Sequence, residues 1–202
     1  MSQKHIIFDF DGVIGDTFAL NWELIYALHP GVTEEQYRID HHKGNVFEEP
    51  VVPFTDVTST EYYRLYNERL SVEHVNRALP HLRELGKDYR LHVVSSNCEG
   101  AIERVLREGG AVECFGHILG KEAHESKVEK FHHIAREEGI NFADAVFVTD
   151  TLGDLKEAEK VGLRACAVTF GYHPRAILLE GSPLFVVDTW EELVQQTHLL
   201  IK

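Results

Sequence analysis

Short apolar runs alternate with longer amphipathic stretches along most of this chain. Runs of this kind, bounded by turn residues, are typical of buried strands, and the stretches between them repeat apolar residues with a helical period. The predicted strands cover residues 6–8, 90–94, 117–119, 145–149, 165–169 and 184–187. Strands that alternate with helices predict an α/β fold with a parallel, doubly wound, Rossmann-like sheet.

Residues 16–71 depart from this alternation, because they carry helical patterns and no strand pattern. The segment lies between the first and second predicted strands, so it leaves and rejoins the sheet beside a single strand end. We predict that it forms a small α-helical cap. The core would then consist of residues 1–15 and 72–202.

The first cap helix is expected to begin after Asp16 or Thr17 as N-cap, and further cap helices are expected at about 33–40 and 59–70. The expected inward face of the first helix carries Phe18, Trp22, Ile25 and Tyr26. In the core, helices are expected at five places. They are an apolar stripe over 75–85, an apolar face around 102–106, residues 126–138, a stretch that ends at 162, and a last stretch from about 191. Pro80 either kinks the first of these or starts its second half, and the sequence leaves both open.

The 202-residue chain carries 20 basic and 33 acidic residues, for a net charge of −13. This excess of negative charge argues against nucleic acid or an anionic membrane surface as a partner. The apolar runs are far shorter than the ~20 residues of a membrane helix, and the first residues lack a signal-peptide pattern. Three cysteines without a CxxC pair indicate reduced thiols, so we expect a cytoplasmic protein. The chain contains two pairs of adjacent histidines, His41-His42 and His132-His133. Adjacent residues do not face one another on a helix, so no histidine metal site is expected from these pairs.

Polar side chains follow three of the predicted strands, at the point where each strand ends. They are Asp9 and Asp11, then Ser95, Ser96 and Asn97, then Asp150 and Asp154. Residues two apart in an extended chain share a face, so the first pair of carboxylates can converge on one bound group. Because open parallel sheets bind ligands at the carboxyl ends of their strands, we expect all three groups to line one crevice.

Lys127 joins these candidates for a separate reason. Ser126 and Glu129 match the capping-box pattern, with Ser126 as N-cap, which places Lys127 at the first helical position. The helix dipole disfavours a cation there by roughly 0.3 kcal/mol or more. A lysine in that position suggests an anion nearby.

The chemistry that fits these residues is phosphoryl transfer. Asp9 can act as the nucleophile and form an aspartyl-phosphate, while Asp11 protonates the leaving oxygen and then activates water. A hard divalent cation, Mg²⁺ above all, would lie between Asp9 and Asp150. Ser95 and Lys127 would hold the phosphate oxygens, because such a transfer depends on positioning and charge neutralisation.

The ordered set of motifs resembles the haloacid dehalogenase-like superfamily. Asp9-Phe10-Asp11-Gly12-Val13 matches its DxDG[TV] motif, Ser95 its strand-ending Ser/Thr, Lys127 its lysine, and residues 149–154 its acidic GDxxxD-type motif. The resemblance implies Asp9 as nucleophile, Asp11 as acid/base with its backbone carbonyl on the metal, Asp150 as a Mg²⁺ ligand and Asp154 as its support. It also implies that Ser95 and Lys127, with Ser96 and Asn97 beside them, bind phosphate.

The insert after the first motif resembles the family's C1-type cap, and the layout is similar to its phosphoglycolate phosphatase-like members. Two positions depart from the pattern. Thr149 replaces the usual glycine before the acidic motif, and Gly15 replaces a bulkier apolar residue of the flap.

The leading hypothesis is a Mg²⁺-dependent phosphatase that acts on a small phosphorylated metabolite. A phosphomutase of the β-phosphoglucomutase type is the alternative, although Val46-Phe47 replaces the Ser-Arg pair of its specificity loop. A non-catalytic binding protein on this fold is a weaker alternative, because it would be expected to have lost an acid. We expect Lys43, in the cap, to lie near the leaving group. The sequence predicts neither the substrate nor the oligomeric state.

Overall fold

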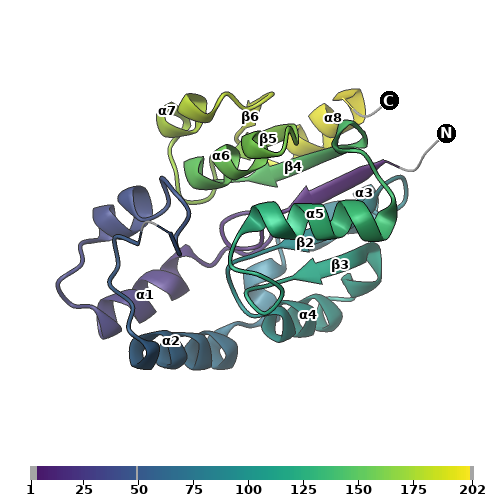
Figure 1. Ribbon diagram of the computed structural model, residues 1–202. Coiled ribbons are helices and arrows are strands. Elements are labelled where there is room, and N and C mark those ends of the chain that lie inside the picture. Colours follow the sequence, from purple (N-terminus) through teal and green to yellow (C-terminus); the bar gives the residue numbers. More distant parts are fainter. Residues whose placement is uncertain (1–3, 49, 201–202) are drawn as a thin grey trace.

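A computed structural model describes residues 4–48 and 50–200 and centres on a six-stranded sheet (Figure 1). The strands are β1 (His5–Phe8), β2 (Arg90–Val94), β3 (Phe115–Leu119), β4 (Ala145–Thr149), β5 (Ala165–Val168) and β6 (Val186–Val187). All neighbours pair in parallel, in the order β3-β2-β1-β4-β5-β6. The predicted parallel, doubly wound α/β fold is therefore confirmed.

The strand order reverses beside β1. Ile6 of β1 pairs with Leu91 of β2 on one side and with Val146 of β4 on the other. Open α/β sheets bind ligands in the crevice at such a reversal, outside the carboxyl ends of the strands. Asp9 directly follows β1 and Asp150 directly follows β4, so these two carboxylates come from the strands that flank this crevice.

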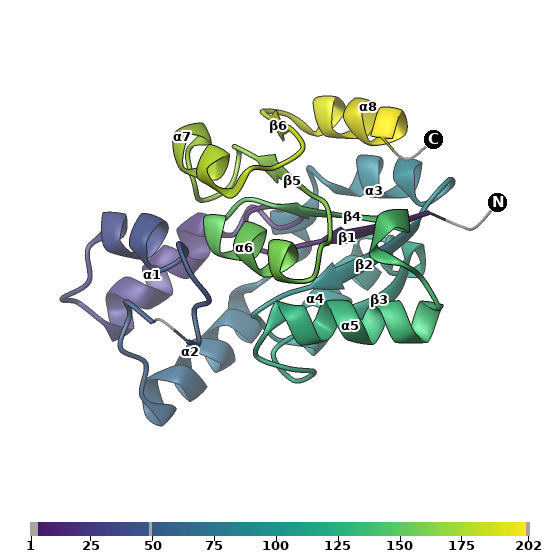
Figure 2. The same ribbon diagram turned by 45° about the horizontal axis from the view of Figure 1, so that its top comes forward.

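Helices cover both faces of the sheet (Figure 2). The core helices are α3 (Leu79–Leu85), α4 (Glu99–Glu108), α5 (Lys127–Glu138), α6 (Leu152–Lys160), the short α7 (Arg175–Leu178) and α8 (Trp190–Leu200). The pattern did not predict α7. Pro80 lies in the first turn of α3, after a separate 3₁₀ helix over Val72–Val75, so it starts a helix and does not kink one.

Alternate residues of β1 point into two apolar cores. Phe8 packs in the core that contains residues of α3, α4 and α8, whereas Ile7 packs with Phe131 of α5 and Ala158 of α6. This is the period-two alternation of a strand that is buried on both faces. Burial on both sides holds β1 rigidly, and with it the turn that carries Asp9 and Asp11.

The insert lies at the end of the sheet toward which the strands point (Figure 1). Its helices are α1 (Phe18–Leu28), a π-helical segment over Gln36–Asp40, and α2 (Asp56–Arg69). Ile25 is buried as predicted, but Tyr26 is 58% exposed, and Leu20 and Leu24 take the buried positions instead. Residue 49 of the insert and the predicted outer bounds of the core, residues 1 and 202, lie outside the described part of the chain.

Two properties of the whole chain were also expected from the sequence. Within residues 4–48 and 50–200, each helix is too short or too polar to cross a membrane. Cys98, Cys114 and Cys166 are free thiols, and burial raises the pKa of Cys98 to about 11. A thiol that stays protonated at neutral pH is a poor nucleophile and a poor metal ligand.

Candidate active site

The first carboxylate pair lies in a tight loop that extends β1. The backbone N–H of Asp9 donates to the carbonyl of Val148 at 2.9 Å, which continues the ladder between β1 and β4. Gly12 N donates to Gly15 O and Gly15 N donates to Phe10 O, both at 2.8 Å, so the loop closes on itself. A sheet hydrogen bond at one end and a closed loop at the other fix where both carboxylates project.

Lys127 links the end of β1 to the first turn of α6. Its Nζ lies 2.9 Å from Asp9 Oδ1 and 2.5 Å from Asp154 Oδ2, and the residue is 3% exposed. Burial alone would lower the pKa of this ammonium, but Asp154 and Asp9 raise it above its ordinary value. The lysine is therefore charged. The sequence suggested an anion beside it, and in the structure these two carboxylates are anions in that position.

The pKa values of Asp9 and Asp154 shift in opposite directions, although both carboxylates contact Lys127. Burial raises the pKa of Asp9 well above its usual range, although Lys127 opposes the rise. Burial also acts to raise the pKa of Asp154, but Lys127 and the hydroxyl of Thr149, which donates to Asp154 Oδ2 at 2.7 Å, bring it below its ordinary value. Thr149, the departure from the family's usual glycine, therefore orients and stabilises an ionised carboxylate of the site.

Asp150 is fully buried and incompletely paired. Its Oδ2 accepts the backbone N–H of Tyr172 at 2.7 Å, while its Oδ1 has no hydrogen-bond partner. Burial raises the pKa of Asp150 to about 8. A Cβ on Gly12 (φ +75°) or on Gly171 would overlap this carboxylate, so two glycines make room for it.

These groups fit a hard divalent cation. A buried carboxylate oxygen without a partner is costly, and a cation that it can coordinate removes that cost. Asp9, Asp150 and Asp154 supply the carboxylate oxygens that Mg²⁺ prefers. The upward pKa shifts of Asp9 and Asp150 have the same main cause, because burial disfavours the charged form of each carboxyl.

Asp11 is held mainly by the insert. Its Oδ1 accepts hydrogen bonds from Thr17 Oγ1 at 2.6 Å, Asn21 Nδ2 at 3.0 Å and Tyr66 OH at 2.9 Å. Its Oδ2 accepts one from Asn97 Nδ2 at 2.7 Å. Thr17 stands at the expected N-cap position of α1, yet its hydroxyl serves Asp11 and makes no capping bond.

The residues after β2 lie beside the same group of carboxylates. Ser95 is completely buried and its Oγ accepts the backbone N–H of Asn97 at 3.0 Å, while Ser96 and Asn97 line the cavity described below. Lys130, one helical turn after Lys127, donates to the carbonyl of Ser95 at 2.6 Å. Burial lowers the pKa of Lys130 to about 8. The sequence analysis missed this second buried lysine.

The expected capping box at the start of α5 is wrong in one respect. Ser126 is the N-cap and accepts from Val128 N at 3.1 Å, but no reciprocal bond from Glu129 forms. Glu157 of α6 takes over instead, since its Oε1 accepts from Ser126 Oγ at 3.1 Å and from Lys127 N at 3.0 Å. A carboxylate at a helix N-terminus is favourable, because it pairs orphan N–H groups and faces the positive end of the dipole.

A loop of the insert docks on the start of α6. Gly153 N donates to the carbonyl of His42 at 2.9 Å, and Asn45 Nδ2 donates to Glu157 Oε1 at 2.9 Å. A Cβ at position 153 would overlap the carbonyl of Gly44, so only glycine allows this approach. The insert is thus closed onto the core, and Glu157 touches both sides of the contact.

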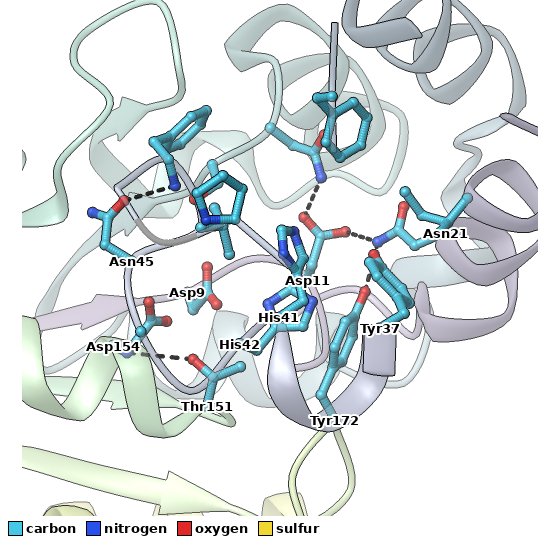
Figure 3. A pocket seen from close by; sticks show the side chains of 18 of the residues that line it. Asp9, Asp11, Asn21, Tyr37, His41, His42, Asn45, Thr151, Asp154 and Tyr172 are labelled. Atoms are coloured by element: carbon cyan, nitrogen blue, oxygen red, sulfur yellow. Dashed lines mark hydrogen bonds between the residues drawn. The ribbon is translucent and has the colours of Figure 1, made fainter. Parts of the chain in front are cut away.

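The docked insert encloses a cavity of about 290 Å³ above the carboxylates. Asp9 and Asp154 lie on one side of it, and Asp11 lies toward Asn21 and Tyr172 (Figure 3). Lys43 is not among the lining residues. Its Nζ is 3.2 Å from Asp40 Oδ1 and its side chain is 45% exposed, so the structure gives no support to the expected contact with the leaving group.

A histidine cluster lies apart from this cavity. His92, His117 and Glu138 bring their ligand atoms within 4.8 Å of one another. The sequence analysis considered only adjacent histidines and therefore missed a group that comes from two strands and a helix. Glu138 Oε1 is already engaged, at 3.1 Å from His117 Nε2 and 3.7 Å from Arg90 Nε, so the cluster is an ion-pair network with an arginine in it.

Comparisons with known proteins identify the family. A profile of the haloacid dehalogenase-like hydrolase family matches residues 6–168. Phosphoglycolate phosphatase from Synechococcus elongatus is 30% identical over 112 residues, which cover 55% of this chain and 53% of that protein. The same-named enzyme from Neisseria meningitidis is 29% identical over 145 residues, or 66% and 61% of the two chains. The chain thus matches about half, or little more, of the length of these relatives.

The fold has solved counterparts as well. A haloacid dehalogenase-like family hydrolase from Streptococcus pneumoniae superposes with a TM-score of 0.77 at 18% identity, over 97% of this chain and 99% of that one. At this identity the likeness concerns the fold alone. The family profile, however, spans β1 to β5 and includes every core motif that carried the resemblance seen in the sequence. The chain belongs to the haloacid dehalogenase-like hydrolase family.

Proposed function

We propose that this protein is a Mg²⁺-dependent phosphatase that hydrolyses a small phosphate monoester through an aspartyl-phosphate on Asp9. The observation that carries the proposal is the buried Lys127–Asp9–Asp154 contact beside Asp150, whose Oδ1 has no partner. Relatives named phosphoglycolate phosphatase support a phosphoric monoester as the substrate. A non-catalytic scaffold would have no use for such a costly concentration of buried charge.

In this mechanism a carboxylate oxygen of Asp9 attacks phosphorus, and the bond from phosphorus to the ester oxygen breaks as the new bond forms. Asp11 donates a proton to the departing alkoxide. It then takes a proton from the water that attacks the aspartyl-phosphate, so its carboxyl returns to its starting state. The four hydrogen bonds to Asp11 hold its carboxyl in one orientation for both steps.

The remaining core residues neutralise and orient the phosphoryl group. Lys127, already 2.9 Å from Asp9, would contact a non-bridging oxygen, and Ser95, Ser96 and Asn97 would hold the others. Asp9, Asp150 and Asp154, with the backbone carbonyl of Asp11, would hold Mg²⁺. When bound, the ion offsets the negative charge of the phosphate and of the carboxylates around it.

We further propose that residues 16–71 act as a cap domain that opens and closes over the cavity. The bonds from Gly153 N and Glu157 to the loop of His42 and Asn45 represent its closed position. Closure excludes water from the site, which strengthens the electrostatic interactions inside it. Closure also brings Thr17, Asn21 and Tyr66 onto Asp11, so it would complete the acid/base arrangement.

Release of inorganic phosphate from p-nitrophenyl phosphate, with Mg²⁺ and with EDTA in its place, tests the proposal. We expect turnover that depends on Mg²⁺ and yields one phosphate per p-nitrophenol. The phosphomutase alternative predicts instead that a sugar phosphate isomerises without equimolar phosphate release. Absence of Mg²⁺-dependent phosphate release from this ester and from acetyl phosphate would refute the phosphatase.

A further inference from the structure

The positive charge of the cavity is confined to the end where phosphate would bind. Among the described residues that line it, Lys127 is the one lysine or arginine, and its ammonium already faces Asp9 and Asp154. Glu157 also lines the cavity, and its Oε1 accepts three hydrogen bonds. A second anionic group on a bound substrate would therefore meet carboxylates and no unpaired cation.

The insert keeps all its cations on its outer surface. Residues 16–71 contain four lysines and arginines, and each forms an ion pair with a carboxylate of the insert itself. They are Arg38 with Glu34, Lys43 with Asp40, Arg64 with Glu61 and Glu68, and Arg69 with Glu23. All four lie outside the lining of the cavity. Lys121 of the core, 4.2 Å from the centre of the Tyr63 ring, lies outside it too.

In place of cations, the insert lines the cavity with flat and apolar side chains. Ile25, Tyr37, Phe47, Phe54, Tyr62 and Tyr63 belong to this part of the lining. Aromatic side chains of this kind favour contact with apolar or aromatic surfaces.

The polar groups that the insert itself contributes to the lining are uncharged. His41 Nδ1 and His42 Nε2 are buried without partners, and both residues line the cavity. Burial lowers the pKa of His41 to about 4 and that of His42 well below its ordinary value, so both rings are neutral at pH 7. Neutral ring nitrogens can pair with a hydroxyl or amide of a ligand, but they do not compensate a buried carboxylate.

From this arrangement we infer that the leaving group is an alcohol with an apolar or aromatic body, at least one hydrogen-bonding group and no negative charge. It is not a carboxylate-bearing alcohol such as glycolate. The inference rests on the proposed phosphatase function and names its substrate class. It separates this chain from the substrate in the names of its relatives, because a carboxylate buried in this cavity would have no cation to pair with.

Matched substrates test the inference by changing charge at nearly constant shape. Phosphoglycolate is compared with glycolamide phosphate, and 4-carboxybenzyl phosphate with 4-carbamoylbenzyl phosphate, with benzyl phosphate as the unsubstituted reference, all with the full chain and Mg²⁺. We expect kcat/KM to favour the uncharged member at least about tenfold in the first pair and about a hundredfold in the second. Benzyl phosphate should exceed glycolamide phosphate.

Equal rates within the pairs, or a preference for phosphoglycolate or for 4-carboxybenzyl phosphate, would overturn the inference and leave the phosphatase standing. Failure to release phosphate from both p-nitrophenyl phosphate and acetyl phosphate would instead refute the phosphatase and this inference with it. The two failures are therefore distinguishable.

A charge introduced into the lining provides a second test. Ser59 lines the cavity from α2, whereas its neighbour Thr60 is exposed and lies outside the lining. Ser59→Lys should raise kcat/KM for 4-carboxybenzyl phosphate relative to benzyl phosphate by about tenfold, and Thr60→Lys, with the same change in net charge, should leave the ratio unchanged. The same change in both variants would contradict the inference. If Ser59→Lys does not fold by circular dichroism, the substrate pairs alone decide.

Discussion

The cavity has a catalytic end at the sheet edge, lined by Asp9, Asp154 and Lys127, and an insert end, lined by aromatic and uncharged polar side chains. At the catalytic end Lys127 lies within hydrogen-bonding distance of both Asp9 and Asp154. At the insert end the charges of the same segment are paired on the outer surface instead. Buried charge is costly, so it is concentrated where the reaction needs it, and the rest of the cavity can select a leaving group without negative charge.

The largest expected effect comes from the catalytic end. Asp9→Asn should lower kcat for p-nitrophenyl phosphate by at least about a thousandfold, because the amide keeps the shape but is a poor nucleophile. Phosphate release measures the loss, and circular dichroism shows whether the fold is intact. Activity within about tenfold of the parent would show that another group attacks phosphorus.

Asp11→Asn should follow, with a loss of about a hundred- to a thousandfold in kcat, the usual contribution of a general acid/base. Its metal binding should persist, because the backbone carbonyl of Asp11 and not its side chain is the proposed ligand. Titration of Mg²⁺ by calorimetry measures this. A loss of Mg²⁺ affinity as large as that of Asp150→Asn would contradict the division of roles.

Asp150→Asn should remove stabilisation by Mg²⁺. At a hundred times its Kd a ligand adds about 2.7 kcal/mol to the free energy of unfolding, which for a chain of this length is about 5–10 °C in Tm. We expect a rise of that size for the parent protein and less than about 1 °C for the variant. A variant that Mg²⁺ still stabilises in full would show that Asp150 is not a ligand.

The stability of the protein in EDTA should depend on pH through the titration of the same carboxyl, Asp150. Burial raises the pKa of folded Asp150 to about 8, so between about pH 4 and 8 the folded state holds a proton that the unfolded state has released. Stability from this group is therefore present at low pH and lost as pH rises through that window. Thermal melts in EDTA should show Tm falling from pH 5 to 8, and a smaller fall in Asp150→Asn. Equal slopes of Tm against pH in the parent and in Asp150→Asn would show that another group causes the fall.

The smallest effects are expected in the loop of the insert. Asn45→Ala removes the bond to Glu157 and the bonds that Asn45 Oδ1 accepts from Phe47 N and Glu48 N, so kcat/KM should fall about tenfold as closure weakens. Lys43→Ala, two residues away, removes an exposed ion pair and should change kcat/KM less than about twofold. A larger loss for Lys43→Ala on benzyl phosphate than on acetyl phosphate would restore the sequence-based expectation for that lysine.

What the sequence determined by itself is the catalytic end. The strand runs, their polar ends and the helix start at Ser126 are local patterns, and parallel strands bring their ends to one edge whatever the details of packing. Asp9, Asp150, Asp154 and Lys127 could therefore be named from the sequence alone, and the family profile covers all four. The failed capping box marks the limit of local reasoning, because Glu157, which replaces Glu129, lies 31 residues beyond Ser126.

Tertiary structure alone decided the insert end. Asn21 meets Tyr172 across 151 residues of chain, and Asn45 meets Glu157 across 112, and no periodicity links such pairs. Whether Lys43 faces the cavity or Asp40 depends on how one turn of the loop rotates as it docks on Gly153. Spacing in the sequence fixes which residues share a strand or a helix face, but the side that faces a ligand is set by packing between elements that are distant in the chain.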